Sequence, residues 1–138
     1  MTDYLNLNPA RLRSAHPDFQ SLFAVMACSF PFLVICTHRP ESEQRKVFLD
    51  GKSKVDWPDS KHNTMPSMAV DAIPIPVDWS DHKRIAYFAG QVMATARKMF
   101  DDGLMVHQLR WGGDWDRDTE LIDNKFNDLV HYELITGV

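Results

Sequence analysis

The stretch Ser60-Lys61-His62-Asn63-Thr64-Met65-Pro66-Ser67-Met68-Ala69-Val70-Asp71 is the one around which the chain is organised. It places a histidine on a polar turn and an aspartate inside an apolar run that is expected to form a strand. An imidazole and a carboxylate on neighbouring backbone segments can share one Zn²⁺ ion. A third ligand must then come from elsewhere, and Asp128-Leu129-Val130-His131-Tyr132-Glu133 can supply it. We therefore expect the fold to bring these two stretches together.

The composition indicates one soluble globular domain. Of the 138 residues, 44% are hydrophobic and 25% are charged, which suffices for one hydrophobic core. The formal net charge of -4 gives no reason to expect a nucleic-acid partner, because such proteins usually carry basic patches. No apolar run approaches the roughly 20 residues of a membrane span. The N-terminus, Met1 to Asn6, lacks the basic start and apolar core of a signal peptide.

Hydrophobic periodicity predicts helices separated by short strands. The helices are expected from Pro17 onward, over 41–50 and over 81–101, and the strands over 32–36, 68–73, 104–111 and 129–135. Cys28 and Cys36 lie in apolar surroundings and are expected to be buried free thiols. Segregated helices and short strands joined by long loops favour an α+β fold, with a small, mainly antiparallel sheet backed by helices. The candidate zinc site would lie at the strand ends.

The residues that could carry chemistry come from these strand ends. His62, Asp71 and His131 can supply two nitrogens and one oxygen to a catalytic zinc that keeps one position open. Residues two apart on a strand share a face, so Glu133 would point the same way as His131. Arg39, at the end of the first strand, is the candidate cation for a developing oxyanion.

Each of these side chains also has an ordinary structural explanation. His62 fits an exposed histidine of a polar loop, and His131 fits a hydrogen-bonded strand histidine. Asp71 fits a carboxylate paired with a lysine or arginine, since a buried carboxylate without a partner is costly. His107 stays open as a spare ligand. The residue types alone leave a metal centre and structural roles both possible.

Taken together, the separate motifs resemble a known family. They are, in chain order, Thr37-x-Arg39, Ser60-x-His62, Ala69-x-Asp71, Trp111-Gly112-Gly113-Asp114-Trp115, and Asp128-x-x-His131 with Glu133 after it. Their order is similar to that of the zinc D-Ala-D-Ala carboxypeptidase and dipeptidase superfamily, the M15 peptidases. Within it, the chain most resembles bacteriophage endolysins of the L-alanyl-D-glutamate endopeptidase branch.

The resemblance implies a zinc metallopeptidase that hydrolyses the peptidoglycan stem peptide at the L-Ala–D-Glu bond. One Zn²⁺ per chain would be held by His62, Asp71 and His131. Asp128 would be the general base that activates a zinc-bound water, and Arg39 would bind the substrate carbonyl or its oxyanion. These roles are what membership of the family would assign to the matching positions.

Three further features follow from the same resemblance. Ser60 would contact the substrate or support a ligand, and Glu133 would support a ligand or, as a weaker alternative, act as the base. Many family members have H-x-x-G-x-A-x-D, whereas here Pro66-Ser67-Met68 replaces the glycine turn and lengthens the spacing. We expect a longer turn that leaves the geometry of His62 and Asp71 intact.

The resemblance also implies a biological setting. It predicts a single zinc peptidase domain over residues 1–138 without a separate cell-wall-binding domain. Such a phage endolysin would remain in the host cytoplasm as a monomer. It would reach the periplasm and cell wall through a holin-type permeabilising partner, and would then cause cytolysis with antimicrobial effect.

Two alternatives stay open at the level of sequence. One is a D-Ala-D-Ala dipeptidase or carboxypeptidase of the same fold. The other is a non-catalytic, zinc-stabilised wall-binding module. Asp128 argues against the second, because a structural zinc site has no need of a free carboxylate beside an open position.

Overall fold

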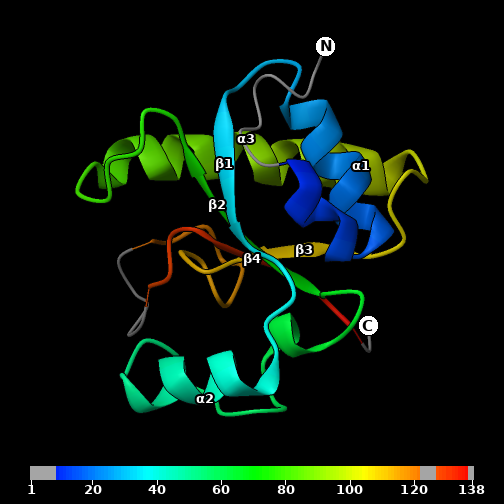
Figure 1. The fold of residues 1–138 in the computed structure, drawn as a ribbon. Helices are drawn as coiled ribbons and strands as arrows, with labels where there is room; N and C mark the ends of the chain where they lie inside the picture. Colours follow the sequence, from blue (N-terminus) through cyan, green and yellow to red (C-terminus); the bar gives the residue numbers. More distant parts are fainter. Residues whose placement is uncertain (1–8, 122–126, 137–138) are drawn as a thin grey trace.

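The computed structural model describes residues 9–121 and 127–136 (Figure 1). The N-terminal residues on which the signal-peptide prediction rests lie outside these ranges. Three α-helices, two short 3-10 helices (η) and four strands make up the described chain. They are η2 (Pro9–Ser14), α1 (Pro17–Met26), β1 (Phe32–Cys36), α2 (Glu41–Leu49), η3 (Lys61–Asn63), β2 (Ala69–Pro74), α3 (His82–Asp101), β3 (Leu109–Trp111) and β4 (His131–Leu134).

The four strands form one antiparallel sheet in the order β1-β2-β4-β3. The apolar strand β2 is central and pairs with both β1 and β4. Its register with β4 sets Asp71 directly opposite His131. Its register with β1 sets Asp71 opposite Cys36, at a point where the pairing shifts. The predicted α+β fold with an antiparallel sheet is confirmed.

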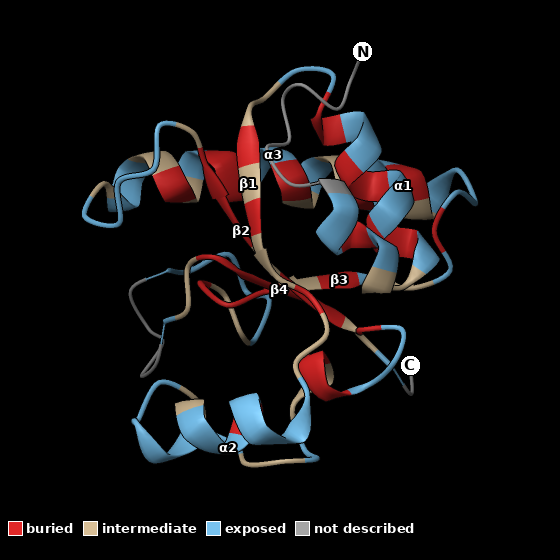
Figure 2. Cartoon of the chain, viewed as in Figure 1, coloured by how far each residue is buried: buried red, intermediate tan, exposed pale blue. Residues whose placement is uncertain are grey.

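The hydrophobic core lies where α1 and α3 cover the strands (Figure 2). Phe23 and Phe32 contact each other in a tilted arrangement with ring centroids 5.3 Å apart, and Phe88 and Tyr132 meet edge to face at 6.5 Å. All four rings are 0% exposed, and burying a side chain of this size contributes about 1.5–3 kcal/mol. The predicted apolar stripe of α3 supplies much of the helical side of this core.

Helix α2 lies beyond the end of β1, apart from α1 and α3 (Figure 1). Its apolar pattern predicts that Val47 and Phe48 face inward, but Phe48 is 38% exposed. The buried residue of α2 is instead Gln44. This helix therefore packs through a polar contact, which bears on the site described below.

Two other predictions differ from the structure. The strand expected over 104–111 is confined to Leu109–Trp111, because the N–H groups of Val106 and His107 donate to the Asp18 carboxylate at 3.1 and 3.0 Å instead of pairing with a strand. Cys28 is exposed rather than buried. Within the described ranges, none of the helices is both long enough and apolar enough to cross a bilayer.

Candidate active site

His62 is held by a capped turn, η3. The Ser60 hydroxyl accepts a hydrogen bond from the His62 N–H at 3.1 Å, and Asn63 Oδ1 accepts one from the Ser60 N–H at 3.0 Å. The histidine is 2% exposed, and its Nδ1 lies 2.7 Å from the Thr37 carbonyl oxygen. Because a carbonyl only accepts, the neutral imidazole carries its proton on Nδ1 and presents a lone pair at Nε2.

The long turn between His62 and Asp71 is anchored to the N-terminal segment through Ser67. The Ser67 N–H donates to the Ser14 carbonyl at 2.8 Å, and the Ser67 carbonyl accepts from the His16 N–H at 2.9 Å. The turn thus follows a path that brings His62 Nε2 to 3.1 Å from Asp71 Oδ1. The extra length does not separate the two side chains.

His131 approaches the same carboxylate oxygen from β4. Its Nδ1 lies 3.1 Å from Asp71 Oδ1, as expected from the register of β2 and β4. Its Nε2 lies 2.9 Å from Glu133 Oε1, so the neutral ring carries its proton on Nε2 and presents a lone pair at Nδ1. Asp71 Oδ1 therefore lies next to one ring nitrogen of each histidine.

The electrostatics of this group favour positive charge next to Asp71. Burial by itself lowers the pKa of His62, but attraction to Asp71 and a hydrogen bond to it raise the pKa to about 10. Burial likewise opposes the shift at His131, whose hydrogen bonds to Asp71 and Glu133 raise its pKa to about 9. The two imidazoles hold the pKa of Asp71 well below its usual range despite burial. A proton or a divalent metal ion can supply that positive charge.

Arg39 reaches the group from the end of β1. Its Nη2 lies 3.7 Å from Asp71 Oδ2. Asp71 is therefore paired with an arginine, as its ordinary structural explanation predicts, and also contacts the two histidines. Its Nη1 donates to Gln44 Oε1 at 2.9 Å, and the same oxygen accepts from Asn63 Nδ2 at 3.1 Å. Cys36 Sγ lies 3.6 Å from Arg39 Nη2, at the edge of the group.

Asp128 is positioned by the backbone of the Trp111-Gly112-Gly113 turn. Its N–H donates to the Gly112 carbonyl at 2.9 Å, and the Gly112 N–H donates to the His131 carbonyl at 2.8 Å. A carboxylate oxygen of Asp128 lies within 4.8 Å of ligand atoms of Asp71 and His131. Burial and repulsion from Asp71 raise the pKa of Asp128. A carboxyl group with a raised pKa is suited to accepting and returning a proton.

Glu133 joins His131 to two basic side chains. Its Oε2 accepts from Arg110 Nη2 at 2.6 Å and lies 3.5 Å from Lys61 Nζ. Burial alone would raise its pKa, but the hydrogen bonds to His131 and Arg110 lower the pKa to about 2. Glu133 is therefore an ionised acceptor that fixes the orientation of the His131 ring.

A cleft of about 920 Å³ contains all the side chains that the sequence singled out for the site. They are Arg39, Ser60, His62, Asp71, Asp128, His131 and Glu133. Trp115 also lines it, with its ring 5.5 Å from that of His131. His107 is not part of this group, because its Nδ1 lies 3.0 Å from the Asp18 carboxylate elsewhere in the fold.

Comparison with known proteins identifies the family. The family model described as phage L-alanyl-D-glutamate peptidase matches residues 6–135. The chain belongs to this family. The fold is similar to the crystal structure of the Serratia marcescens L-Ala D-Glu endopeptidase ChiX, with a TM-score of 0.69 and 25% sequence identity, over 91% of this chain and 84% of that one. No curated protein matches the sequence.

Membership of the phage L-alanyl-D-glutamate peptidase family confirms the resemblance inferred from the motifs. Sequence reasoning nevertheless missed three side chains that shape the site, namely Gln44, Cys36 and Arg110. Gln44 is a polar residue in a short helix, and nothing in the local sequence marks it as buried beside Arg39. The apolar neighbours of Cys36 predict a core residue, and nothing in the local sequence marks Arg110 as the partner of Glu133.

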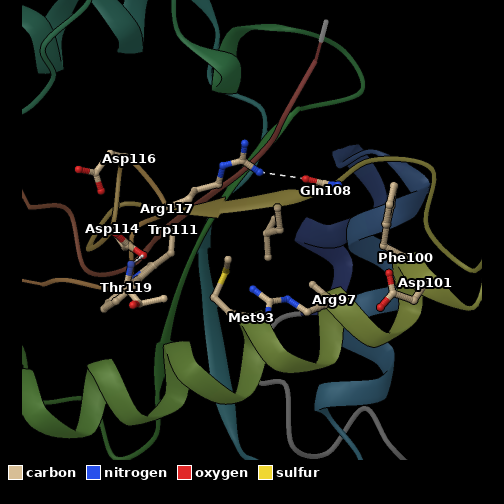
Figure 3. A pocket seen from close by; sticks show the side chains of 12 residues that line it. Met93, Arg97, Phe100, Asp101, Gln108, Trp111, Asp114, Asp116, Arg117 and Thr119 are labelled. Carbon is tan, nitrogen blue, oxygen red and sulfur yellow. Dashed lines mark hydrogen bonds between the residues drawn. The ribbon is translucent and has the colours of Figure 1, made fainter. Parts of the chain in front are cut away.

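A second pocket, of about 480 Å³, lies between α3 and the segment that follows β3 (Figure 3). Arg97 on α3 and Arg117 on the loop both line it, and Arg117 donates to Gln108 at 2.9 Å. Asp101 and Asp116 line the same pocket, so its charges are mixed. None of the predicted site residues contributes to it, and the peptidase chemistry is therefore assigned to the larger cleft.

Proposed function

We propose that this protein is a zinc-dependent peptidase that hydrolyses the L-Ala–D-Glu bond of the peptidoglycan stem peptide. The observation that carries the proposal is the convergence of His62 Nε2 and His131 Nδ1 on Asp71 Oδ1, each at 3.1 Å. The family described as phage L-alanyl-D-glutamate peptidase supports the choice of bond over D-Ala–D-Ala. The Serratia endopeptidase with a similar fold supports the same choice.

The donor set fits zinc. Tetrahedral Zn²⁺ with bonds of about 2.0–2.2 Å places neighbouring ligand atoms roughly 3.3–3.5 Å apart. The nitrogen of each histidine lies at a similar distance, 3.1 Å, from Asp71 Oδ1. Each histidine has its other nitrogen occupied, by the Thr37 carbonyl for His62 and by Glu133 for His131. Such partners fix the ring orientation that a metal ligand needs. We assign His62, Asp71 and His131 as the three protein ligands.

The remaining side chains supply proton transfer and charge stabilisation. When bound, Zn²⁺ would lower the pKa of a water molecule and polarise the scissile carbonyl. Asp128 would take a proton from the attacking water and pass it to the amine of the leaving D-Glu. The Arg39 guanidinium, which Gln44 holds at 2.9 Å, would donate hydrogen bonds to the developing oxyanion. Ser60 acts by capping the turn that carries His62.

We further infer that the enzyme acts as a phage endolysin, since the family is one of phage peptidases. Its substrate would then be the cell wall of the host, reached with the help of a holin-type permeabilising partner. When the enzyme is added from outside, lysis of intact cells should require an agent that opens their outer layer. Purified sacculi should be digested directly.

Digestion of purified sacculi tests the proposed reaction. We expect mass spectrometry to detect new N-terminal D-Glu, and we expect a chelator to stop its release until Zn²⁺ is added back. Released D-Ala would instead indicate a carboxypeptidase or dipeptidase. Binding to sacculi without any cleavage would indicate a wall-binding module and would overturn the proposal.

A further inference from the structure

An exposed tryptophan that the proposed hydrolysis does not use lines the cleft. Trp79 is 57% exposed, more than any other of the four tryptophans of the chain. It lines the same 920 Å³ cleft as Asp71 and Asp128. Within the described ranges, its ring stacks on no other aromatic ring and its indole N–H donates no hydrogen bond. No contact within the described fold therefore accounts for a large apolar ring at this place.

The turn that carries Trp79 is fixed by hydrogen bonds on the C-terminal side of the ring. Asp78 Oδ1 accepts from the Ser80 N–H at 3.0 Å and from the Ser80 hydroxyl at 2.6 Å. The Asp81 N–H donates to the Asp78 carbonyl at 3.1 Å, and the Asp81 side chain caps α3 by accepting from the Arg84 N–H at 3.1 Å. The ring is therefore presented by a preformed backbone, so that binding a ligand requires little further ordering.

Trp79 and α2 reach the cleft from different parts of the fold. Trp79 lies in the connection between β2 and α3, which runs beside α3, whereas α2 lies apart from both (Figure 1). Residues of α2 and of the loop after it line the same cleft, as do Asp71 on β2 and His131 on β4. A substrate that crosses the proposed metal ligands can therefore contact Trp79 at one end and the α2 segment at the other.

The two ends of the cleft differ in charge. Among the described residues that line it, 39–61 contribute mainly cationic side chains, namely Arg39, Lys52, Lys54 and Lys61 beside Asp59. The other lining residues contribute mainly acidic side chains, namely Asp71, Asp116, Asp128 and Glu133 beside Arg110. The difference lies in the summed charge of each group and requires no single side chain to be free. It favours the anionic end of a substrate near 39–61 and a neutral end near Trp79.

We infer that Trp79 stacks on the sugar ring to which the L-Ala end of the stem peptide is attached. This inference rests on the proposed function. In peptidoglycan, L-Ala is joined through a lactyl group to N-acetylmuramic acid, which is then uncharged, whereas D-Glu and the residue after it bring carboxylates. A face of a pyranose ring presents C–H groups, and these pack on the electron-rich face of an indole. Trp79 thus sets the direction in which the substrate lies across the metal ligands.

The test compares two synthetic substrates that differ only in the sugar. One is N-acetylmuramoyl-L-Ala-γ-D-Glu-diaminopimelate, and the other carries a D-lactoyl group in place of the whole sugar unit. For the first, we expect Trp79→Ala to lower kcat/KM by about 2- to 10-fold, the range for a stacked aromatic contact. The loss should appear in KM with kcat unchanged, because the ring is remote from the reacting atoms. For the second, kcat/KM should not change, and Trp79→Phe should retain most of the activity on both.

A matched control is Tyr87→Ala, which removes an aromatic ring that is 64% exposed on α3 and lies outside the cleft. An equal loss in this control would overturn the inference. If Trp79→Ala loses activity equally on both substrates, the ring contacts the peptide and not the sugar, and the inference is wrong. Unchanged cleavage of both substrates by Trp79→Ala would also overturn it, while leaving the proposed function intact. If the unaltered enzyme binds zinc but cleaves neither substrate, the proposed function itself fails.

Discussion

Replacing Gly112 with alanine should separate positioning of the base from binding of the metal. A Cβ atom at Gly112 would lie 2.1 Å from the carbonyl oxygen of Asp128 and 3.0 Å from its carbonyl carbon. Both are backbone atoms, so no side-chain rotation can relieve the overlap. The segment that carries Asp128 must therefore move away from the turn by more than about 1 Å to reach an ordinary contact distance.

The size of the effect follows from that displacement. A misplacement of about 1 Å in a reacting group can cost on the order of 100-fold in rate, and we expect kcat to fall by about that factor. Overpacking costs about 1–3 kcal/mol, and weakening the 2.8 and 2.9 Å hydrogen bonds of Gly112 adds about 1 kcal/mol. For a domain of this size, a total loss of about 2–4 kcal/mol corresponds to a fall in Tm of roughly 7–14 °C.

The assay measures kcat on the L-Ala-γ-D-Glu peptide, zinc content and Tm for each variant. Gly90→Ala is the matched control, because a Cβ atom at this exposed helical position meets no atom within 4 Å. The control should keep full activity and gain roughly 0.5–1 kcal/mol of stability. If Gly112→Ala keeps its zinc and loses less than about tenfold in kcat, the backbone contact does not position Asp128 and the reasoning is refuted.

Four other substitutions test the rest of the site. Asp128→Asn should lower kcat by about 10²- to 10⁴-fold with zinc still bound, and an active variant would exclude Asp128 as the base. His131→Ala should reduce zinc content measured by elemental analysis, and an unchanged content would remove this residue from the ligand set. Glu133→Gln should weaken zinc affinity by roughly 10-fold, measured by competition with a chelating dye, because the His131 ring loses an ionised partner. Tyr132→Phe should leave Tm unchanged or raise it. The buried Tyr132 hydroxyl has no hydrogen-bond partner among the described residues, and an unpaired buried hydroxyl costs about 1–3 kcal/mol. A lower Tm would contradict this prediction.

The sequence predicts those site residues that lie on strands. Asp71 stands out as the charged residue of an apolar strand, and His131 begins another strand with Glu133 two residues later. Antiparallel pairing of β2 with β4 then places Asp71 opposite His131, so a local pattern and one pairing rule suffice. His62 joins them because the long turn that follows it leads directly into β2.

The part that escapes prediction depends on contacts between loops and on partners far apart in sequence. Hydrophobic periodicity directs Val47 and Phe48 inward, yet α2 packs on a loop whose backbone needs hydrogen bonds, and Gln44 supplies them. Cys36 looks like a core thiol because its neighbours are apolar, but it ends the strand and faces the site. Arg110 lies directly opposite Glu133 in the register of β3 and β4, and the pair escapes prediction because the sequence does not show that these two strands are neighbours.

The register of strand β4 determines which of its side chains enter the core and which face the cleft. His131 and Glu133 face the cleft, whereas Tyr132 between them is 0% exposed and packs against Phe23 and Phe88. A slip of one residue against β2 would exchange the two faces, burying both polar side chains and expelling the aromatic ring. Insertions or deletions in this strand should therefore abolish folding and activity together. Libraries that aim to alter the enzyme should keep β4 at constant length and place their diversity in the loops.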